Sequence, residues 1–255
     1  MKKLLSVLIY SLIVNAIYSQ SDLKLLPGSS SPGVINDSTV TDIDGNVYHT
    51  VTIGSQIWMI ENLRTTHYRN GEVILNITID SLWVDASIGA WCDYNNDTLN
   101  DSKFGKLYNY FAIEDTRNLA PEGWHIPTAT EWAILEDYLA IIDFKQNEIK
   151  PENKKREIKR ANLLAAPTDW AKSTESGAIG SHRTLKNSTG FNGLPGGCRS
   201  ANGTFKSITK SGYWWCVNTS DNNMVFSRSL SYDTNVLGLN LGFKVRGLSV
   251  RCIKD

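Results

Sequence analysis

Short runs of hydrophobic and polar residues near position 50 predict β-strands. Val47–Ile53 and Gln56–Met59 have strand composition, and a Gly-Ser pair separates them as a turn. An Asp-Gly pair at 44–45, just before the first run, is a signal for a hairpin turn. The folded domain is therefore expected to start near Thr41.

A helical period in the hydrophobic positions predicts a helix that begins at Thr128. Thr128 and Glu131 have the spacing of a capping box, in which each side chain bonds the free backbone amide of the other. The apolar residues that follow share one helical face: Trp132, Leu135, Leu139 and Ile142. A second helix is predicted from Pro151 to about Leu164. Its basic stretch, Lys150–Arg160, indicates a solvated helix face rather than a binding patch.

From Phe191 onward, the hydrophobic runs are short and clusters of Asn, Gly, Ser and Asp separate them, which is typical of strands. The predicted strands are Leu194–Arg199, Gly212–Val217, Met224–Leu230 and Leu248–Ile253. Helices in the middle and antiparallel strands at both ends predict a single α+β domain over residues 41–255.

The N-terminus has the pattern of a signal peptide. A Lys-Lys pair precedes the apolar run Leu4–Ile17, which is too short for a stable transmembrane helix, and Ser19 marks a cleavage point. We expect a signal peptide over residues 1–19 and a flexible linker over 20–40. The protein is then exported to the periplasm, the cell surface or the medium, with no membrane insertion after the signal is removed.

Charge and composition narrow the class of partner. Lys plus Arg total 26 and Asp plus Glu total 26, so the formal charge is zero. This balance gives no electrostatic footprint for nucleic acid or an anionic membrane. Hydrophobic residues make up 41% of the chain and charged residues 20%, as in an ordinary globular protein. An extracellular glycan or protein is the partner class that stays open.

One run of acidic and amide residues resembles the opening of a calcium loop. Asp93, Asn95 and Asp97 alternate as oxygen ligands do in such loops. Thr98 stands where the loop needs glycine, however, and Phe104 stands where it needs a bidentate glutamate. A surface Asx turn is the alternative interpretation, and it requires no cofactor.

The residues with catalytic potential form no recognisable motif. The histidines His49, His67, His125 and His182 are scattered, and none lies in a His-Glu-x-x-His pattern or beside a sequence-local metal partner. His125, between two apolar residues, is expected to be a packed, hydrogen-bonded core residue. Since no acid–base or nucleophile constellation stands out, we predict a protein that is not an enzyme.

An aromatic run in the predicted strand Gly212–Val217 is a candidate for ligand contact. Alternation along a strand puts Tyr213 and Trp215 on one face and Trp214 and Cys216 on the other. Trp214 is expected to be buried. Tyr213 and Tyr232 are the predicted ligand-binding residues, by stacking on a sugar or peptide.

Seven segments occur in an order that is specific when they are taken together: Asp44–Tyr48, Val51–Leu63, Gly105–Tyr110, Ala120–Thr128, Gly190–Gly197, Gly212–Trp215 and Ser249–Asp255. They resemble the Fibrobacter succinogenes major paralogous domain, a family of exported bacterial domains. The resemblance implies a fold similar to C-type lectins and to the formylglycine-generating enzyme. In that fold the terminal strands pair, two helices flank them, and a loop-rich second sheet displays the ligand surface.

Four cysteines in an exported chain indicate disulfides, with three possible connectivities. Cys198 and Cys216 stand where family members often have tyrosine and serine, and a short connection separates their predicted strands, so we expect them to pair. Cys92 then remains for Cys252, which alternatively stays a buried free thiol. Cys198 and Cys216 are also candidates for the copper-binding pair of the formylglycine-generating enzyme, although the residues between them do not match that motif.

Export, the missing catalytic constellation and the lectin-like resemblance together favour a non-catalytic binding or adhesion module at the bacterial surface. A structural subunit of a surface assembly is one alternative. An enzyme related to the formylglycine-generating oxidases is the other.

Overall fold

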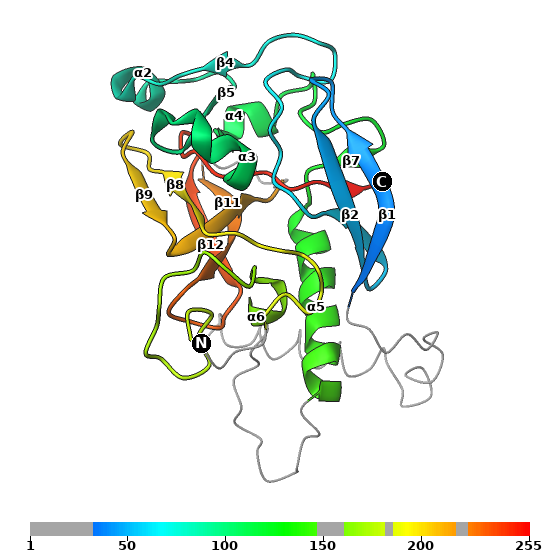
Figure 1. Cartoon of the computed structure of the whole chain (residues 1–255). Coiled ribbons are helices and arrows are strands. Elements are labelled where there is room, and N and C mark those ends of the chain that lie inside the picture. The colour runs from blue at the N-terminus through cyan, green and yellow to red at the C-terminus, as the bar shows by residue number, and fades with distance from the viewer. Residues whose placement is uncertain (1–32, 147–160, 182–185, 218–223) are drawn as a thin grey trace, which may run out of the picture. The chain divides into compact units, whose positions relative to one another are not determined.

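The described residues form three sheets, and the first of them joins the beginning and the end of the folded chain (Figure 1). Its strand order is β1 (Val34–Thr41), β2 (Val47–Ile53), β3 (Gln56–Met59), β13 (Ile253–Lys254) and β7 (Trp124–His125), and every pair is antiparallel. The computed structural model describes residues 33–146, 161–181, 186–217 and 224–255. The two strands predicted around residue 50 are confirmed.

Strand β1 corrects the predicted linker over residues 20–40. From Val34 onward the chain is a strand that pairs with β2, and its register shifts between Asn36 and Thr39. The middle of β1 is polar, and β1 lies at the edge of its sheet, so its backbone pairing leaves little hydrophobic pattern in the sequence. The predicted signal peptide and the first part of the predicted linker lie outside the described residues.

The second sheet contains the strands of the C-terminal part. Its order is β12 (Gly238–Phe243), β11 (Met224–Ser231), β10 (Ser211–Trp215), β8 (Gly196–Arg199) and β9 (Phe205–Ile208). The pairs are antiparallel except β8 with β10, which is parallel. The sequence did not predict β9 and β12, and two glycines in β12 weaken its strand pattern.

A small third sheet and several short helices occupy residues 75–113. The sheet order is β4 (Leu75–Asn76), β5 (Ala90–Cys92) and β6 (Leu107–Tyr108). The helical segments are α2 (Asp80–Val84), the 3-10 turns Tyr94–Asn96 and Thr98–Asn100, α3 (Asp101–Phe104) and α4 (Tyr110–Ile113). The fold is mixed, with sheets dominant over helices.

The predicted long helix is confirmed as α5 (Ala129–Gln146), and its capping box forms. The Thr128 amide donates to Glu131 Oε2 at 2.8 Å, and the Glu131 amide donates to Thr128 Oγ1 at 3.2 Å. The four apolar residues predicted to share a face are all buried. Of the second predicted helix, the structure describes only its end, α6 (Ala161–Leu164). The stretch Lys150–Arg160 lies outside the described residues.

Aromatic side chains fill the core between α5, the first sheet and the second sheet. The rings of Trp58 and Trp132 are 5.0 Å apart, and Phe191 lies 5.9 Å from Trp214. A second core cluster, which includes Tyr108 and Trp215, lies on the other side of the second sheet. Along the described ranges, no helix has the length and apolarity needed to cross a membrane.

Candidate functional site

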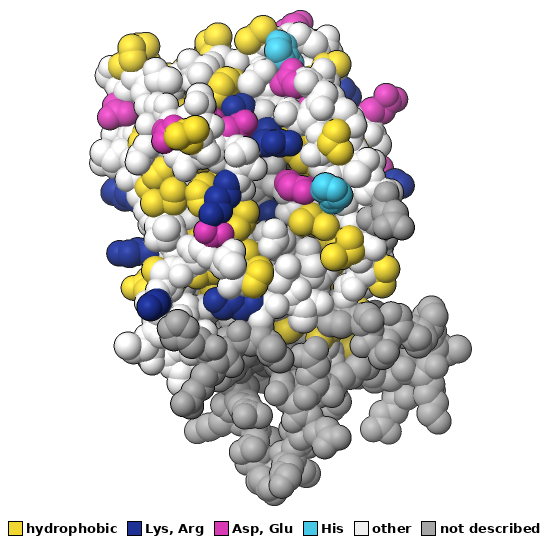
Figure 2. Space-filling model, in the orientation of Figure 1, with side chains coloured by type: hydrophobic (Ala, Val, Ile, Leu, Met, Phe, Trp, Pro, Cys, Tyr) yellow, Lys and Arg dark blue, Asp and Glu magenta, His cyan; other side chains and the backbone are white. Residues whose placement is uncertain are grey.

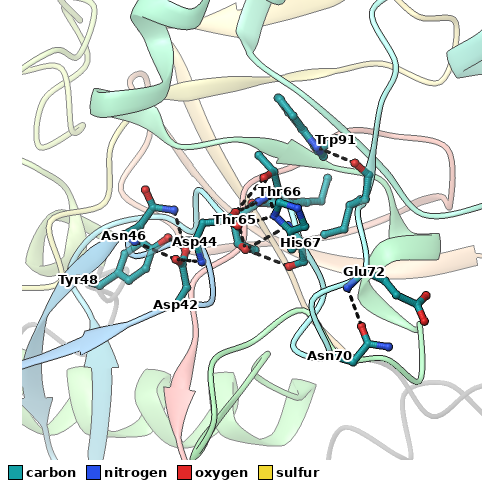
Figure 3. Close-up of polar contacts among 12 residues, drawn as sticks. Asp42, Asp44, Asn46, Tyr48, Thr65, Thr66, His67, Asn70, Glu72 and Trp91 are labelled. Atoms are coloured by element: carbon teal, nitrogen blue, oxygen red, sulfur yellow. Dashed lines mark hydrogen bonds and ion pairs between the residues drawn. The ribbon is translucent and has the colours of Figure 1, made fainter.

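Figure 3 shows a polar cluster in which the turn between β1 and β2 meets the loop over residues 65–67. The buried carboxylate of Asp42 accepts hydrogen bonds from the backbone amides of Asp44 and Asn46, the Asn46 side chain and the Tyr48 hydroxyl, the last at 2.5 Å. Burial raises the pKa of Tyr48, and the bond to Asp42 raises it further. Asp42 therefore holds the turn in shape.

Asp44 joins this turn to the loop. Its carboxylate accepts bonds from the amide of Thr66 and from the hydroxyls of Thr66 and Thr65, at 2.9 Å and 3.1 Å, and it contacts His67 Nδ1. Burial raises the pKa of Asp44, but the bonds from Thr66, His67 and Thr65 outweigh this effect, and its pKa is lowered. The Asp44 carboxylate is therefore ionised, its oxygens accept hydrogen bonds from the loop, and it orients the His67 ring.

A hollow of about 220 Å³ lies beside this cluster. Its lining residues are Thr41, Asp42, Ile43, Arg69, Leu119, Ala120, Pro121 and Glu122. Arg69 donates to the carbonyls of Ala120, Pro121 and Trp124 at 2.7–2.8 Å. These bonds fix the backbone of residues 120–124 against the Arg69 side chain at one side of the hollow.

The other histidines lie apart from this cluster. His49 pairs with Glu61 at 2.8 Å on the surface, and His182 lies outside the described residues. His125 lies between two carboxylates: its Nε2 is 2.7 Å from Glu131 Oε1, and its Nδ1 is 2.6 Å from Asp255 Oδ1. The predicted hydrogen bonding of His125 is confirmed, but its side chain is 35% exposed, so the predicted core position is wrong.

The two carboxylates change the titration of His125. Burial lowers the pKa of His125, but its bonds to Asp255 and Glu131 outweigh burial, and the pKa is raised. A raised folded-state pKa means that protonated His125 stabilises the fold below its unfolded-state pKa. That contribution is lost as the pH rises through the folded-state pKa.

Two of the predicted calcium ligands, Asp93 and Asp97, interact with other groups of the protein. Asp93 is buried and its Oδ1 lies 3.2 Å from Lys106 Nζ. Asp97 accepts a bond from the Leu99 amide at 3.0 Å, which is the Asx turn of the alternative interpretation. Asn95 has a left-handed backbone, with φ of 56°. Within the part of the chain that the structure describes, no three His, Cys, Asp or Glu side chains are grouped to hold a metal.

The two tyrosines predicted to bind a ligand lie in β10 and directly after β11. Tyr213 is half-buried, and the Arg246 guanidinium lies 5.5 Å from its ring centre. Tyr232 follows the end of β11, and its backbone amide donates to the carbonyl of Lys210, the residue before β10. The predicted alternation is confirmed, because Trp214 is buried against the α5 side and Trp215 against the opposite side.

All four cysteines are buried free thiols, so the expected pairs of Cys198 with Cys216 and of Cys92 with Cys252 are not formed in this structure. The assumption of antiparallel neighbours was wrong for the first pair. Strands β8 and β10 run parallel with Gly197 opposite Gly212, and the two thiols enter different core clusters. Cys92 and Cys252 also belong to different clusters. Burial raises the pKa of Cys216 to about 11 and that of Cys92 to about 12.

Sequence reasoning missed a group of exposed aliphatic side chains around α2 and β4. We call it the 73–88 surface, and it consists of Val73, Leu75, Ile79, Leu82, Val84 and Ile88. These side chains are 39–63% exposed, and Figure 2 shows hydrophobic side chains at the surface over α2 and β4. In the sequence, residues 73–88 form a mainly hydrophobic segment between turn residues. This pattern does not distinguish exposed hydrophobic positions from buried ones.

Two buried side chains hold the 73–88 surface on the body of the domain. Trp83 of α2 points inward, and its Nε1 donates to the Val245 carbonyl at 2.6 Å. Arg199 of β8 lies 4.5 Å from the Trp83 ring centre, and it donates to the Ile77 carbonyl at 2.6 Å. The backbone that carries the exposed aliphatic side chains of the 73–88 surface is therefore fixed to the rest of the domain.

Comparison with known families gives one match. The family model of the Fibrobacter succinogenes major domain matches residues 51–254. The chain belongs to this family. No curated protein and no solved structure matches the chain.

In this Fibrobacter succinogenes major domain, the matched range contains the 73–88 surface but begins after Asp42 and Asp44. The matched range also contains a second exposed apolar feature. Leu239, Leu241 and Phe243 are 57%, 54% and 58% exposed, and they alternate along β12, the edge strand of the second sheet. An apolar edge strand is a template for pairing with another chain.

Proposed function

We propose that this protein is a non-catalytic binding module that acts outside the cell and binds a protein partner through the 73–88 surface. The exposed aliphatic side chains of that surface carry the proposal, because six of them lie within residues 73–88, and a concentration of exposed apolar surface marks an interaction site. Ile79, the residue before α2, is 58% exposed, and Leu82 in the middle of α2 is 56% exposed. Aliphatic side chains suit apolar groups of a polypeptide, whereas sugars are usually stacked on aromatic rings.

The polar groups of the site support binding over catalysis. Asp42 and Asp44 accept hydrogen bonds that fix the turn between β1 and β2 and the loop over residues 65–67. His125 is held between two carboxylates. The lectin-like arrangement that the family resemblance implies also fits, since its loop-rich sheet displays the ligand surface. In this chain α2 connects β4 and β5 of the third sheet. Export rests on the N-terminal sequence pattern.

Arrays of peptides and glycans test this proposal. The purified protein should bind peptides rich in apolar residues, and the double variant Ile79→Asp with Leu82→Asp should lose that binding while it keeps the native circular dichroism spectrum. Ile134→Asp is the matched control, because Ile134 is 44% exposed on α5, away from the 73–88 segment. Binding that the double variant retains, or binding to glycans alone, would refute the proposed surface.

The apolar row on β12 favours a second candidate, a structural subunit of a surface assembly. Residues Gly238–Phe243 carry no charge, and charged side chains are one of the devices that keep edge strands from pairing. Antiparallel pairing of two copies centred on Leu241 would set Leu239 opposite Phe243. Light scattering after size exclusion should then show a dimer or a larger species that Leu241→Lys converts to monomer. A wild-type protein that stays monomeric at high concentration rules this candidate out.

A further inference from the structure

A lysine and two aspartates meet at the base of the loop that connects β5 and β6. Cys92 and Leu107 are opposite each other in these strands, so Asp93 and Lys106 are the next cross-strand neighbours. Lys106 Nζ lies 3.2 Å from Asp93 Oδ1 and 3.1 Å from Asp101 Oδ1. The three side chains come from the end of β5, the start of α3 and the residue before β6.

The two side chains that would react, Lys106 and Asp93, are buried. The side chains of Lys106 and Asp93 are 7% and 5% exposed, and that of Asp101 is 28% exposed. The Trp91 ring lies 4.0 Å from Lys106 Nζ, which leaves the ammonium between an aromatic face and two carboxylates. Burial raises the pKa of Asp93 even though Lys106 opposes it, so a proton is added to this carboxylate more easily than to an exposed one.

A buried ion pair loses hydration that its mutual attraction only partly restores. An amide carries no charge, so formation of an amide between the two side chains would remove both buried charges. The reaction requires an amine in contact with a carboxyl group, a second carboxyl group to carry a proton, and surroundings that keep water away. Lys106 supplies the amine, Asp93 the reacting carboxyl group and Asp101 the proton carrier, and the burial of Lys106 and Asp93 limits access of water.

We propose that Lys106 and Asp93 condense into an intramolecular isopeptide bond, with Asp101 as the proton carrier. A proton passes from the Lys106 ammonium to the Asp101 carboxylate, and the free amine attacks Cγ of Asp93. A carbon–nitrogen bond forms, and one carbon–oxygen bond of Asp93 breaks. The departing oxygen leaves as water with two protons from the nitrogen, one of them by way of Asp101. The net change is ammonium plus carboxylate to amide plus water, without any co-reactant.

A second lysine–aspartate pair in the chain, Lys103 with Asp169, serves as a comparison for the pair of Lys106 and Asp93. Lys103 also contacts an aspartate, Asp169, but these side chains are 48% and 25% exposed. Hydration keeps both charges stable there, so this pair stays an ion pair. The isopeptide bond closes the loop over residues 93–106 at its base, and it is independent of the binding function proposed above.

Trypsin digestion of the denatured protein followed by mass spectrometry tests the bond. Trypsin cuts after lysine and arginine but not after an acylated lysine, so Lys106 is cut only when it is unlinked. The linked protein yields a branched species in which peptide 70–103 is joined to peptide 104–117, lighter by one water than the sum of the two. Separate peptides 104–106 and 107–117 at full mass from the wild-type protein overturn the proposal.

Three variants assign the roles. Lys106→Arg keeps the charge but forms no amide, so it should yield only unlinked peptides. Asp101→Asn should leave Asp93 and Lys106 unlinked in a protein with the native circular dichroism spectrum. A branched species from Asp101→Asn overturns the role of Asp101 as proton carrier. Lys103→Arg is the matched control, and it should retain the branched species.

Discussion

Replacement of Arg199 by lysine should loosen the anchorage of the 73–88 surface. Arg199 is fully buried in β8, where it donates from Nε to the Gly203 carbonyl at 2.8 Å. Its terminal nitrogens donate to the carbonyls of Ile77 and Thr78, at 2.6 Å and 3.0 Å. A lysine ammonium is a single point charge on a flexible stem, and it cannot reproduce this fork of bonds.

The structure sets the size of the effect. The Gly203 bond is buried, and loss of a bond from a charged donor costs about 1.5–3 kcal/mol. The bonds to Ile77 and Thr78 are partly buried, so water can replace the donor and each loss costs about 0.5–1.5 kcal/mol. The Asp80 side chain is 61% exposed, so its ion pair with Arg199 contributes less than about 1 kcal/mol. Because lysine can keep one of these contacts, we expect a loss of about 2–4 kcal/mol.

Urea titration measures the free energy of unfolding, and hydrogen exchange measures the local opening of residues 77–80. Arg199→Lys should lower the free energy of unfolding and speed hydrogen exchange at residues 77–80. Arg64→Lys is the control, because the Arg64 guanidinium donates an exposed bond of 3.4 Å to the Val47 carbonyl and lies 5.6 Å from the Tyr48 ring centre, where a lysine also fits, and the change should stay within about 0.5 kcal/mol. If Arg199→Lys changes the unfolding free energy by less than about 1 kcal/mol and leaves exchange at 77–80 unchanged, the reasoning is wrong.

Three further predictions concern other parts of the fold. The stability that the wild-type protein has over His125→Gln should fall by less than about 1 kcal/mol between about pH 6 and about pH 8 in melting curves, because partly exposed His125 loses its charge, whereas the buried thiols titrate alike in both proteins. Leu135→Ala on α5 should lower the unfolding free energy in urea by about 2–5 kcal/mol, since Leu135 is fully buried. Asp44→Asn should keep the fold but speed amide exchange at Thr66, because the bond that protects this amide weakens; unchanged exchange would contradict the role of Asp44 as a clip.

Features that depend on neighbouring residues could be predicted from the sequence. The capping box of Thr128 and Glu131 and the buried face of α5 follow from spacings within two turns of helix. Strands β2 and β3 were found because a short turn joins them and the hydrophobic pattern is strong. The candidate site was harder to find, because Asp44 meets Thr66 from more than twenty positions away, and nothing local in the sequence indicates that contact.

Edge strands were missed for a physical reason. An interior strand is covered on both sides and needs hydrophobic residues, whereas an edge strand is held mainly by backbone bonds on one side. The middle of β1 is polar, and β12 places its apolar residues on the exposed face rather than the buried one. The pattern that identifies a strand by its buried face is therefore weak at both edges.

The cysteine pairing shows the limit of local inference most directly. The expected pair of Cys198 and Cys216 assumed that strands adjacent in sequence are antiparallel neighbours. The chain instead adds β9 on the far side of β8 and returns so that β10 runs parallel to β8. In that register Cys198 lies beside Tyr213, three positions short of Cys216, and three positions on a strand reverse the face on which a side chain points. Asp93 and Lys106 differ, because they flank two strands that are direct antiparallel neighbours, where a contact follows from the register itself.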